Sequence, residues 1–176
     1  MNSLAPSGDP VAPPMGSPDL APYQDPRTIR AIIGSARTVA VVGLSPNPLR
    51  PSYFVAFYLQ RHGYRIVPVN PREHEILGET CYPSLTAIPF AIDVVDVFRV
   101  PAAVPQIARE AVQIGAGALW LQFGVISLEG AEIATKGGLR VVMDRCMKVE
   151  HARFLGRMHW FGMNTGQISG RHLHDE

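Results

Sequence analysis

The chain has 176 residues, which suits one domain with terminal extensions, and 47% of them are hydrophobic, which is ample for a core. Its formal net charge of +1 gives no general attraction to nucleic acid or to a membrane surface. No apolar run approaches the roughly 18 residues that span a bilayer. Two cysteines and an N-terminus unlike a signal peptide predict a cytoplasmic protein without a disulfide framework.

Prolines crowd the beginning of the chain, with glycine, serine and alanine between them. This composition cannot bury enough apolar surface to offset the entropy lost on ordering. Residues 1–24 are therefore expected to form a disordered or extended tail. We expect one folded domain over residues 25–155 and a loosely held C-terminal tail over residues 156–176.

Helical and strand patterns alternate from residue 25 onward. Asp25 and Pro26 suit the start of a helix, because aspartate caps a helix N-terminus and proline fits the first helical position. Helical patterns, with Ser52 and Ser127 as expected N-caps, cover residues 25–34, 52–63, 104–115, 127–137 and 148–155. Nearly continuous apolar runs predict buried strands at residues 38–42, 65–70, 94–98, 118–123 and 140–143. Residues 73–89 are expected to be irregular.

This alternation predicts an α/β fold. Strands that are apolar on both faces need helices on both sides of the sheet. We expect a Rossmann-like, doubly wound domain with a five-stranded parallel sheet, in the strand order 3-2-1-4-5 that right-handed crossovers favour. Ligands of such sheets bind outside the carboxyl ends of the strands, near the point where the strand order reverses.

The residues that follow the five strands are therefore the candidate site. In chain order they are Gly43, Ser45, Arg50 and Ser52; Asn70, Pro71 and Arg72; Phe98, Arg99 and Pro101; Gln122 and Gly124; and Asp144, Arg145 and Cys146. Four arginines and one aspartate would meet at this edge of a nearly neutral molecule. The pattern predicts a polyanionic ligand.

The loop after the first strand has the layout of a phosphate site. A strand leads into Gly43, then into a proline-stiffened loop, and then into a helix. The N–H groups and the dipole of a helix N-terminus attract phosphate, and Arg50 would add charge and Ser45 a hydroxyl. The alternative is that Ser52 only caps the helix and that Arg50 is solvated.

The same loop departs from the dinucleotide fingerprint. An NAD site calls for G-x-G-x-x-G after the first strand and an acidic residue after the second. Here no further glycine follows Gly43 until Gly63, and the second strand ends in Asn70 followed by Arg72. These residues argue against NAD and permit NADP or another phosphorylated adenine nucleotide.

Catalytic and metal-binding candidates are few. Cys146 lies beside Arg145 and near Lys148, and positive neighbours lower the pKa of a thiol and make it more reactive. The alternative is a buried, inert cysteine. Glu150 and His151 could belong to an acid/base pair, but no second cluster of histidine or cysteine completes a metal site. No metal and no catalytic triad is predicted.

Several short motifs, taken together and in this order, resemble the small stand-alone CoA-binding proteins, relatives of the CoA-binding domain of succinyl-CoA synthetase. They occupy residues 41–46, 50–52, 68–71, 76–78, 93–99, 120–124 and 143–151. The resemblance spans residues 25–155 and implies a Rossmann-type fold that binds coenzyme A along the strand ends.

The resemblance also implies roles for the candidate residues. Gly43, Ser45, Arg50 and Ser52 would hold phosphates, Asn70, Pro71 and Arg72 would lie near the adenosine, Phe98, Arg99 and Pro101 would flank the ligand, and Gln122 and Gly124 would face the pantetheine arm. Arg145 and Cys146 complete the candidate set. The synthetase carries its active-site histidine on a domain that this chain lacks, so ligase activity is not implied.

The expected function is therefore binding of coenzyme A or an acyl-CoA without turnover, with no nucleic-acid or membrane partner. Two alternatives remain open. One is an NADP-linked oxidoreductase, which the missing glycine fingerprint disfavours. The other is a redox protein in which Cys146 forms a mixed disulfide with the CoA thiol.

Overall fold

The structure, a computed structural model, describes residues 16–156. A five-stranded parallel sheet forms its centre, with the strands β1 (Thr38–Val42), β2 (Arg65–Val69), β5 (Val94–Val97), β6 (Ala118–Leu121) and β7 (Arg140–Val142). All residues of β5 and β6 are buried, as expected for strands covered on both faces. The predicted doubly wound α/β fold is confirmed.

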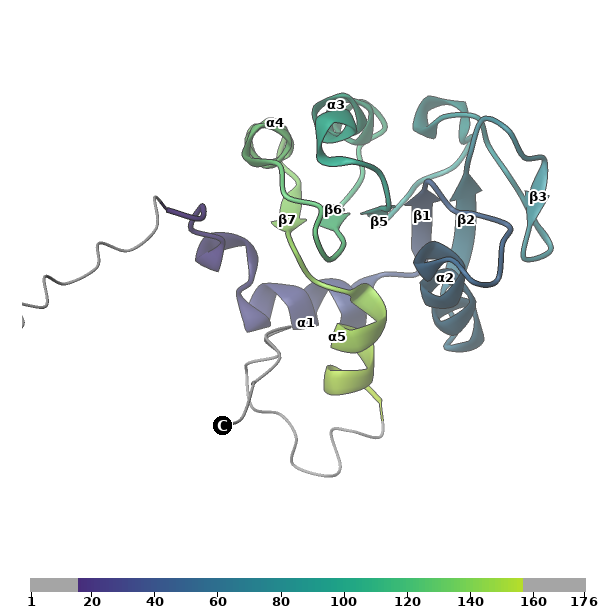
Figure 1. Cartoon of the computed structure of the whole chain (residues 1–176), viewed down its shortest axis with the longest axis horizontal. Coiled ribbons are helices and arrows are strands. Elements are labelled where there is room, and N and C mark those ends of the chain that lie inside the picture. The colour runs from purple at the N-terminus through teal and green to yellow at the C-terminus, as the bar shows by residue number, and fades with distance from the viewer. Residues whose placement is uncertain (1–15, 157–176) are drawn as a thin grey trace, which may run out of the picture.

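Helices form a layer on each side of the sheet (Figure 1). One layer contains α3 (Val104–Gln113) and α4 (Leu128–Lys136). The other contains α1 (Pro26–Ser35), α2 (Pro51–Arg61) and α5 (Met147–Phe154). Short elements complete the chain: η1 (Ala21–Tyr23), β3 (Glu75–Ile76), β4 (Glu79–Thr80), η2 (Leu85–Ala87) and η3 (Pro101–Ala103).

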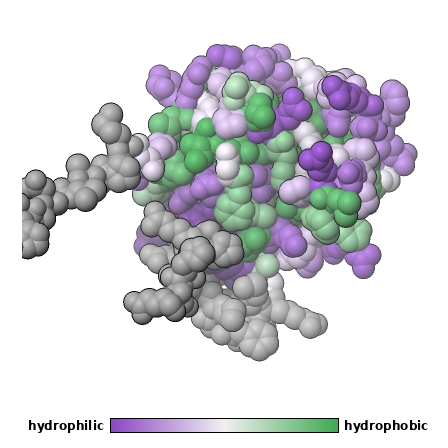
Figure 2. All heavy atoms as spheres, viewed as in Figure 1, coloured by the Kyte–Doolittle hydropathy of each residue, from purple (hydrophilic) through white to green (hydrophobic). Residues whose placement is uncertain are grey.

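Side chains that alternate along the strands fill two separate cores. Val95 and Val97 of β5 pack in the core beneath α3 and α4, whereas Val94 packs in the core beneath α1, α2 and α5. Trp120 is fully buried in the second core, and its indole N–H donates to the Arg145 carbonyl at 2.7 Å. On the surface, hydrophobic residues emerge as patches among hydrophilic ones (Figure 2).

The predicted strand order is wrong. The strands lie in the order β2-β1-β5-β6-β7, so the third predicted strand, β5, pairs with β1 instead of lying outside β2. The outer edge of β2 is occupied by Tyr82, whose N–H donates to the Pro68 carbonyl and whose carbonyl accepts from the Asn70 N–H, both at 2.9 Å. This bridge leaves no room for another strand at that end of β2.

The helix starts are partly as predicted. Asp25 caps α1 by accepting a hydrogen bond from the Thr28 N–H, and Ser127 caps α4 in the same way through Gly130. Ser52 is not the N-cap of α2. That position belongs to Arg50, because Pro51 takes the first helical position that its ring favours.

The described residues include the end of the predicted N-terminal tail, before residue 25. Leu20 and Tyr23 pack against the core beneath α3 and α4. The Tyr23 carbonyl accepts from the Met143 N–H at 3.2 Å, and Gln24 donates to the Met143 carbonyl at 3.1 Å. The segment thus covers the end of β7. Residues 1–15 and 157–176, where most of both predicted tails lie, are outside the described residues.

Candidate functional site

The strand order reverses between β1 and β5, and Gly43 lies at this switch point, directly after β1. Its φ of +85° belongs to the left-handed region that glycine adopts most readily. A Cβ at this position would lie 2.8 Å from the Arg99 Cδ and 2.9 Å from the Phe98 carbonyl oxygen. The chain therefore needs a glycine here to bring the Arg99 side chain across the end of β1.

A cavity of about 280 Å³ opens beside this contact. Buried apolar side chains from three directions contribute to its lining: Val42, Val69, Leu85 and Ile107. The rest of the lining comes from the strand ends, the loop before η2, η3 and α3: Gly43, Asn70, Pro71, Pro83, Ser84, Arg99, Ala103, Gln106 and Glu110. Apolar walls with a few polar groups at the rim are typical of a small-molecule site.

Four predicted site residues meet at this cavity, namely Gly43, Asn70, Pro71 and Arg99. Asn70 joins two loops, because its side-chain amide donates to the Leu44 carbonyl at 2.9 Å while its oxygen accepts from the Arg72 N–H at 3.0 Å. Its polar atoms are therefore engaged in positioning the backbone at the rim.

The predicted phosphate loop lies on the other side of the same strand ends. The Ser52 hydroxyl is buried and accepts from the Ser45 N–H at 3.1 Å, so it holds the loop against α2. The Ser45 hydroxyl accepts from the Asn47 N–H at 3.1 Å. Arg50 is exposed and begins α2. The loop is fixed by its own hydrogen bonds, with the arginine turned to solvent.

The other predicted residues surround the edge but do not line the cavity. Arg72, Pro101 and Gly124 are exposed, and Phe98 is half-buried against the core beneath α2. The Gly124 N–H donates to the Asp144 carboxylate at 2.8 Å, which links the ends of β6 and β7. Asp144 thus has a structural partner.

Gln122 points into the protein and not toward a ligand. Its side-chain amide donates at 2.7 Å to Oδ1 of Asp96, a residue of β5 that is 0% exposed. Within residues 16–156, Oδ2 of Asp96 has no hydrogen-bond partner. Burial raises the pKa of Asp96 to about 7, although the bond from Gln122 acts in the opposite direction.

Cys146 is buried in the core beneath α5, next to Met147. Burial raises the pKa of the Cys146 thiol, and the Asp96 carboxylate acts in the same direction. Of the two hypotheses for Cys146, the buried cysteine fits the structure, because desolvation outweighs the positive neighbours. Arg145 donates to the Gln24 side chain at 3.0 Å and so helps to fasten the segment that precedes α1.

Sequence reasoning missed the part of the lining that comes from Ser84 and from α3. Gln106 and Glu110 are one helical turn apart and both face the cavity. The helical period predicts that Val104 and Ile107 lie on the buried face of α3. It does not predict that the polar residues of α3 lie near the end of β2. The folded structure shows that α3 lies there.

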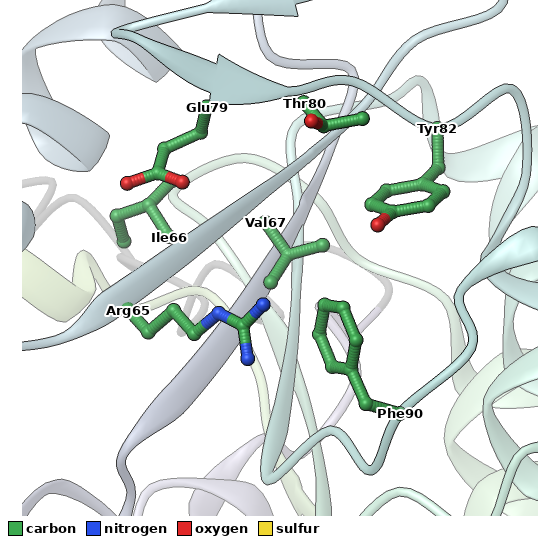
Figure 3. Close-up of a pocket in the computed structure, with 7 residues that line it drawn as sticks. All are labelled: Arg65, Ile66, Val67, Glu79, Thr80, Tyr82 and Phe90. Carbon is green, nitrogen blue, oxygen red and sulfur yellow. The ribbon is translucent and has the colours of Figure 1, made fainter.

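A second hollow, at the outer edge of β2, is too small to be the main site, at about 60 Å³ (Figure 3). The Arg65 guanidinium lies over the Phe90 ring, 3.9 Å from its centroid, and the Tyr82 ring meets the same ring edge-on. These contacts cover the open edge of the sheet beyond the Tyr82 bridge.

Neither a membrane span nor a metal site emerges from the described part of the chain. None of the helices between residues 16 and 156 has the length and apolar character needed to cross a bilayer. Over the same residues, histidine, cysteine and acidic side chains nowhere gather in a group of three that could hold a metal ion.

Comparison with known proteins agrees with this architecture. The family model described as CoA binding domain matches residues 37–152. The uncharacterized protein YneT of Bacillus subtilis is 40% identical over 124 residues, which cover 70% of this chain and 92% of that protein. A solved structure of a hypothetical protein from Pyrococcus horikoshii OT3 is 38% identical, with a TM-score of 0.75 over 81% of this chain and 100% of that one.

Larger relatives contain the same domain as one part. ADP-forming acetate–CoA ligase II of Archaeoglobus fulgidus is 34% identical over 138 residues, which cover 70% of this chain but only 19% of that protein. The match to the family model extends over more than half of the chain, from the first strand of the sheet to the last helix. This chain belongs to the CoA-binding-domain family.

Proposed function

We propose that this protein binds coenzyme A, or an acyl-CoA, at the carboxyl edge of β1, β2 and β5. The observation that carries the proposal is the cavity at the switch point, where Gly43 allows Arg99 to cross the end of β1. A ligand phosphate can approach the backbone closely at a glycine and meet a guanidinium beside it.

The charges at this edge suit the chemistry of coenzyme A, which carries a pyrophosphate and a 3′-phosphate on an adenosine. Arg50, Arg72 and Arg99 follow the three strands that meet at the site, and all three are exposed. The end of β2 carries Asn70 in place of the acid that binds the ribose hydroxyls of NAD. An acid there would repel a phosphorylated ribose.

Binding without turnover fits the cavity better than catalysis. Its lining includes neither cysteine nor histidine, and the Ser84 hydroxyl there bonds with the Thr86 hydroxyl and not with a base. The buried thiol of Cys146, with its raised pKa, gives little support to disulfide exchange with coenzyme A. The activity of the ligases among the relatives is not part of this proposal.

Arg99→Ala should weaken coenzyme A binding about tenfold to a hundredfold, because a charge-assisted hydrogen bond contributes roughly 1.5–3 kcal/mol. Isothermal titration calorimetry of the full chain measures the dissociation constant. The affinity of the unmodified protein should also fall as salt is raised, since the contact is electrostatic.

Arg30→Ala is the matched control, because Arg30 is an exposed arginine of α1, outside the cavity. It should leave the affinity unchanged. Titrations with NADPH and NADH test the competing nucleotide. Saturable binding of NADPH without binding of coenzyme A would reject the proposal in favour of a nicotinamide enzyme.

A further inference from the structure

Asp96 lies near the end of β5, close behind the candidate site. In the parallel register of β1 and β5 it is aligned with Val41, so Gly43 lies only two residues further along the strand direction, or about 7 Å. Side chains alternate along β5, and Val95 and Val97 pack in the core beneath α3 and α4. The Asp96 side chain therefore points to the other side of the sheet, where the loop after β1 leads into α2.

The carboxyl group of Asp96 has few partners in this interior. Within residues 16–156, no ion pair includes it, and Oδ2 has no hydrogen-bond partner while Oδ1 accepts from Gln122. From α5 it is approached by the Cys146 thiol, and the buried acid and base of that helix, Glu150 and Arg153, pair with each other. The buried residues of α1 and α2 on this side are uncharged. An ionised Asp96 would thus be a poorly compensated negative charge.

Phosphates bound at the strand ends would act on this charge through the protein interior. At roughly 10 Å and an effective dielectric constant of about 20, two unit charges change an equilibrium by roughly tenfold. A ligand that neutralises the exposed Arg50 and Arg99 acts in the same direction, because their positive charge favours the ionised carboxyl group. Binding of a polyanion should therefore favour the protonated Asp96. By linkage, protonation of Asp96 should favour binding by the same factor.

We infer that Asp96 couples proton binding to ligand binding at this site: coenzyme A binds more tightly while the Asp96 carboxyl group is neutral and more weakly once it is ionised. The inference rests on the proposed binding of coenzyme A. Since burial raises the pKa of Asp96 to about 7, the change in charge falls in the neutral range. The affinity therefore decreases as the pH rises from 6 to 8.

The test measures the dissociation constant of coenzyme A by calorimetry at pH 6 and pH 8, for the full-length protein and for Asp96→Asn. An asparagine can still accept the bond from Gln122, but it cannot ionise. The two proteins should bind equally at pH 6, whereas at pH 8 the unmodified protein should bind about fivefold to tenfold more weakly. Titration of the ligand phosphates affects both proteins alike, so it cancels in the comparison at each pH.

Proton uptake is the readout that a structural role of Asp96 would not change. Titrations at pH 7.5 in two buffers that differ in ionisation enthalpy measure the protons taken up on binding. The unmodified protein should take up about half a proton more per bound ligand than Asp96→Asn. A purely structural effect of the substitution would instead change the affinity by one factor at both pH values.

Asp93→Asn is the matched control, because Asp93 lies before β5 at the opposite edge of the sheet. Its hydrogen bonds hold its pKa below the ordinary value, so it stays ionised at both pH values and its removal should keep the pH response. If coenzyme A binds and Asp96→Asn shows the same pH dependence and proton uptake as the unmodified protein, the inference is wrong. If coenzyme A binds to neither protein, the proposed function is wrong and the inference falls with it.

Discussion

The Asp96→Asn variant should be more stable than the unmodified protein by about 4 kcal/mol at pH 8. The pKa of Asp96 rises from 3.8 to about 7 on folding because the carboxyl group is fully buried, and each pKa unit corresponds to about 1.36 kcal/mol. An asparagine has nearly the same shape, can still accept the hydrogen bond from Gln122, and carries no charge to bury.

The sign of the pH dependence follows from proton binding. Between pH 4 and pH 7 the folded state keeps the Asp96 proton while the unfolded state loses it. The free energy of unfolding therefore falls as the pH rises through this window. Asp96→Asn should remove this loss, so the two proteins should differ little at pH 4 and most above pH 7. Urea denaturation at a series of pH values measures both curves.

Asp93 lies in the loop just before β5, and Asp93→Asn is a control for which the change in stability should have the opposite sign. Burial raises the pKa of Asp93, but hydrogen bonds from Thr38 and Arg37 outweigh it and hold this pKa below its ordinary value. Asp93→Asn should therefore destabilise the protein at pH 7 and matter less at pH 3. An Asp96→Asn variant that is also less stable at pH 8 would contradict the account of Asp96.

Gly43→Ala should abolish measurable coenzyme A binding and lower stability by about 3 kcal/mol. The positive φ alone costs an alanine roughly 1–2 kcal/mol, and overpacking adds a similar amount. The new Cβ would meet the Phe98 carbonyl, which is backbone and cannot turn aside, and it would push Arg99 out of place. Calorimetry of binding and urea denaturation measure the two effects.

Gly63→Ala introduces backbone strain without a steric clash, so it is the control for Gly43→Ala. Gly63 has a similar φ of +91°, but no atom within 4 Å would meet its Cβ. This variant should lose about 1–2 kcal/mol of stability and keep its affinity for coenzyme A. Equal affinity losses in the two variants would mean that Gly43 acts through general stability and not through the site.

The strands and helices could be predicted because apolar periodicity and helix caps are local signals. The strand order depends on pairing between distant segments, and in this chain Pro68 is the residue that indicates it. Pro68 lies within β2, and proline occurs in sheets almost only on edge strands because it lacks an N–H. The order 3-2-1-4-5 would have made this strand internal. The bridge from Tyr82 to the Pro68 carbonyl marks the same edge.

The polar residues of α3 show a second limit of the sequence patterns. Apolar periodicity identifies the buried face of a helix but not the loops that its polar residues meet, so Gln106 and Glu110 had no predicted connection to Asn70. The prediction of residues at the strand ends, such as Gly43 and Arg99, does not depend on the order, and these two residues line the cavity. The pairing of Gln122 with Asp96 could not be predicted, because it depends on how β5 and β6 are aligned.

The most direct test of the proposed site is to follow the backbone amide resonances of the ¹⁵N-labelled full chain during titration with coenzyme A. Binding at the carboxyl edge predicts saturable shifts at Gly43, Asn70, Arg99 and Glu110. The opposite edge of the sheet, represented by Gly63 and Gly117, should stay unchanged. Shifts confined to that opposite edge, or no saturable shift at all, would contradict the account.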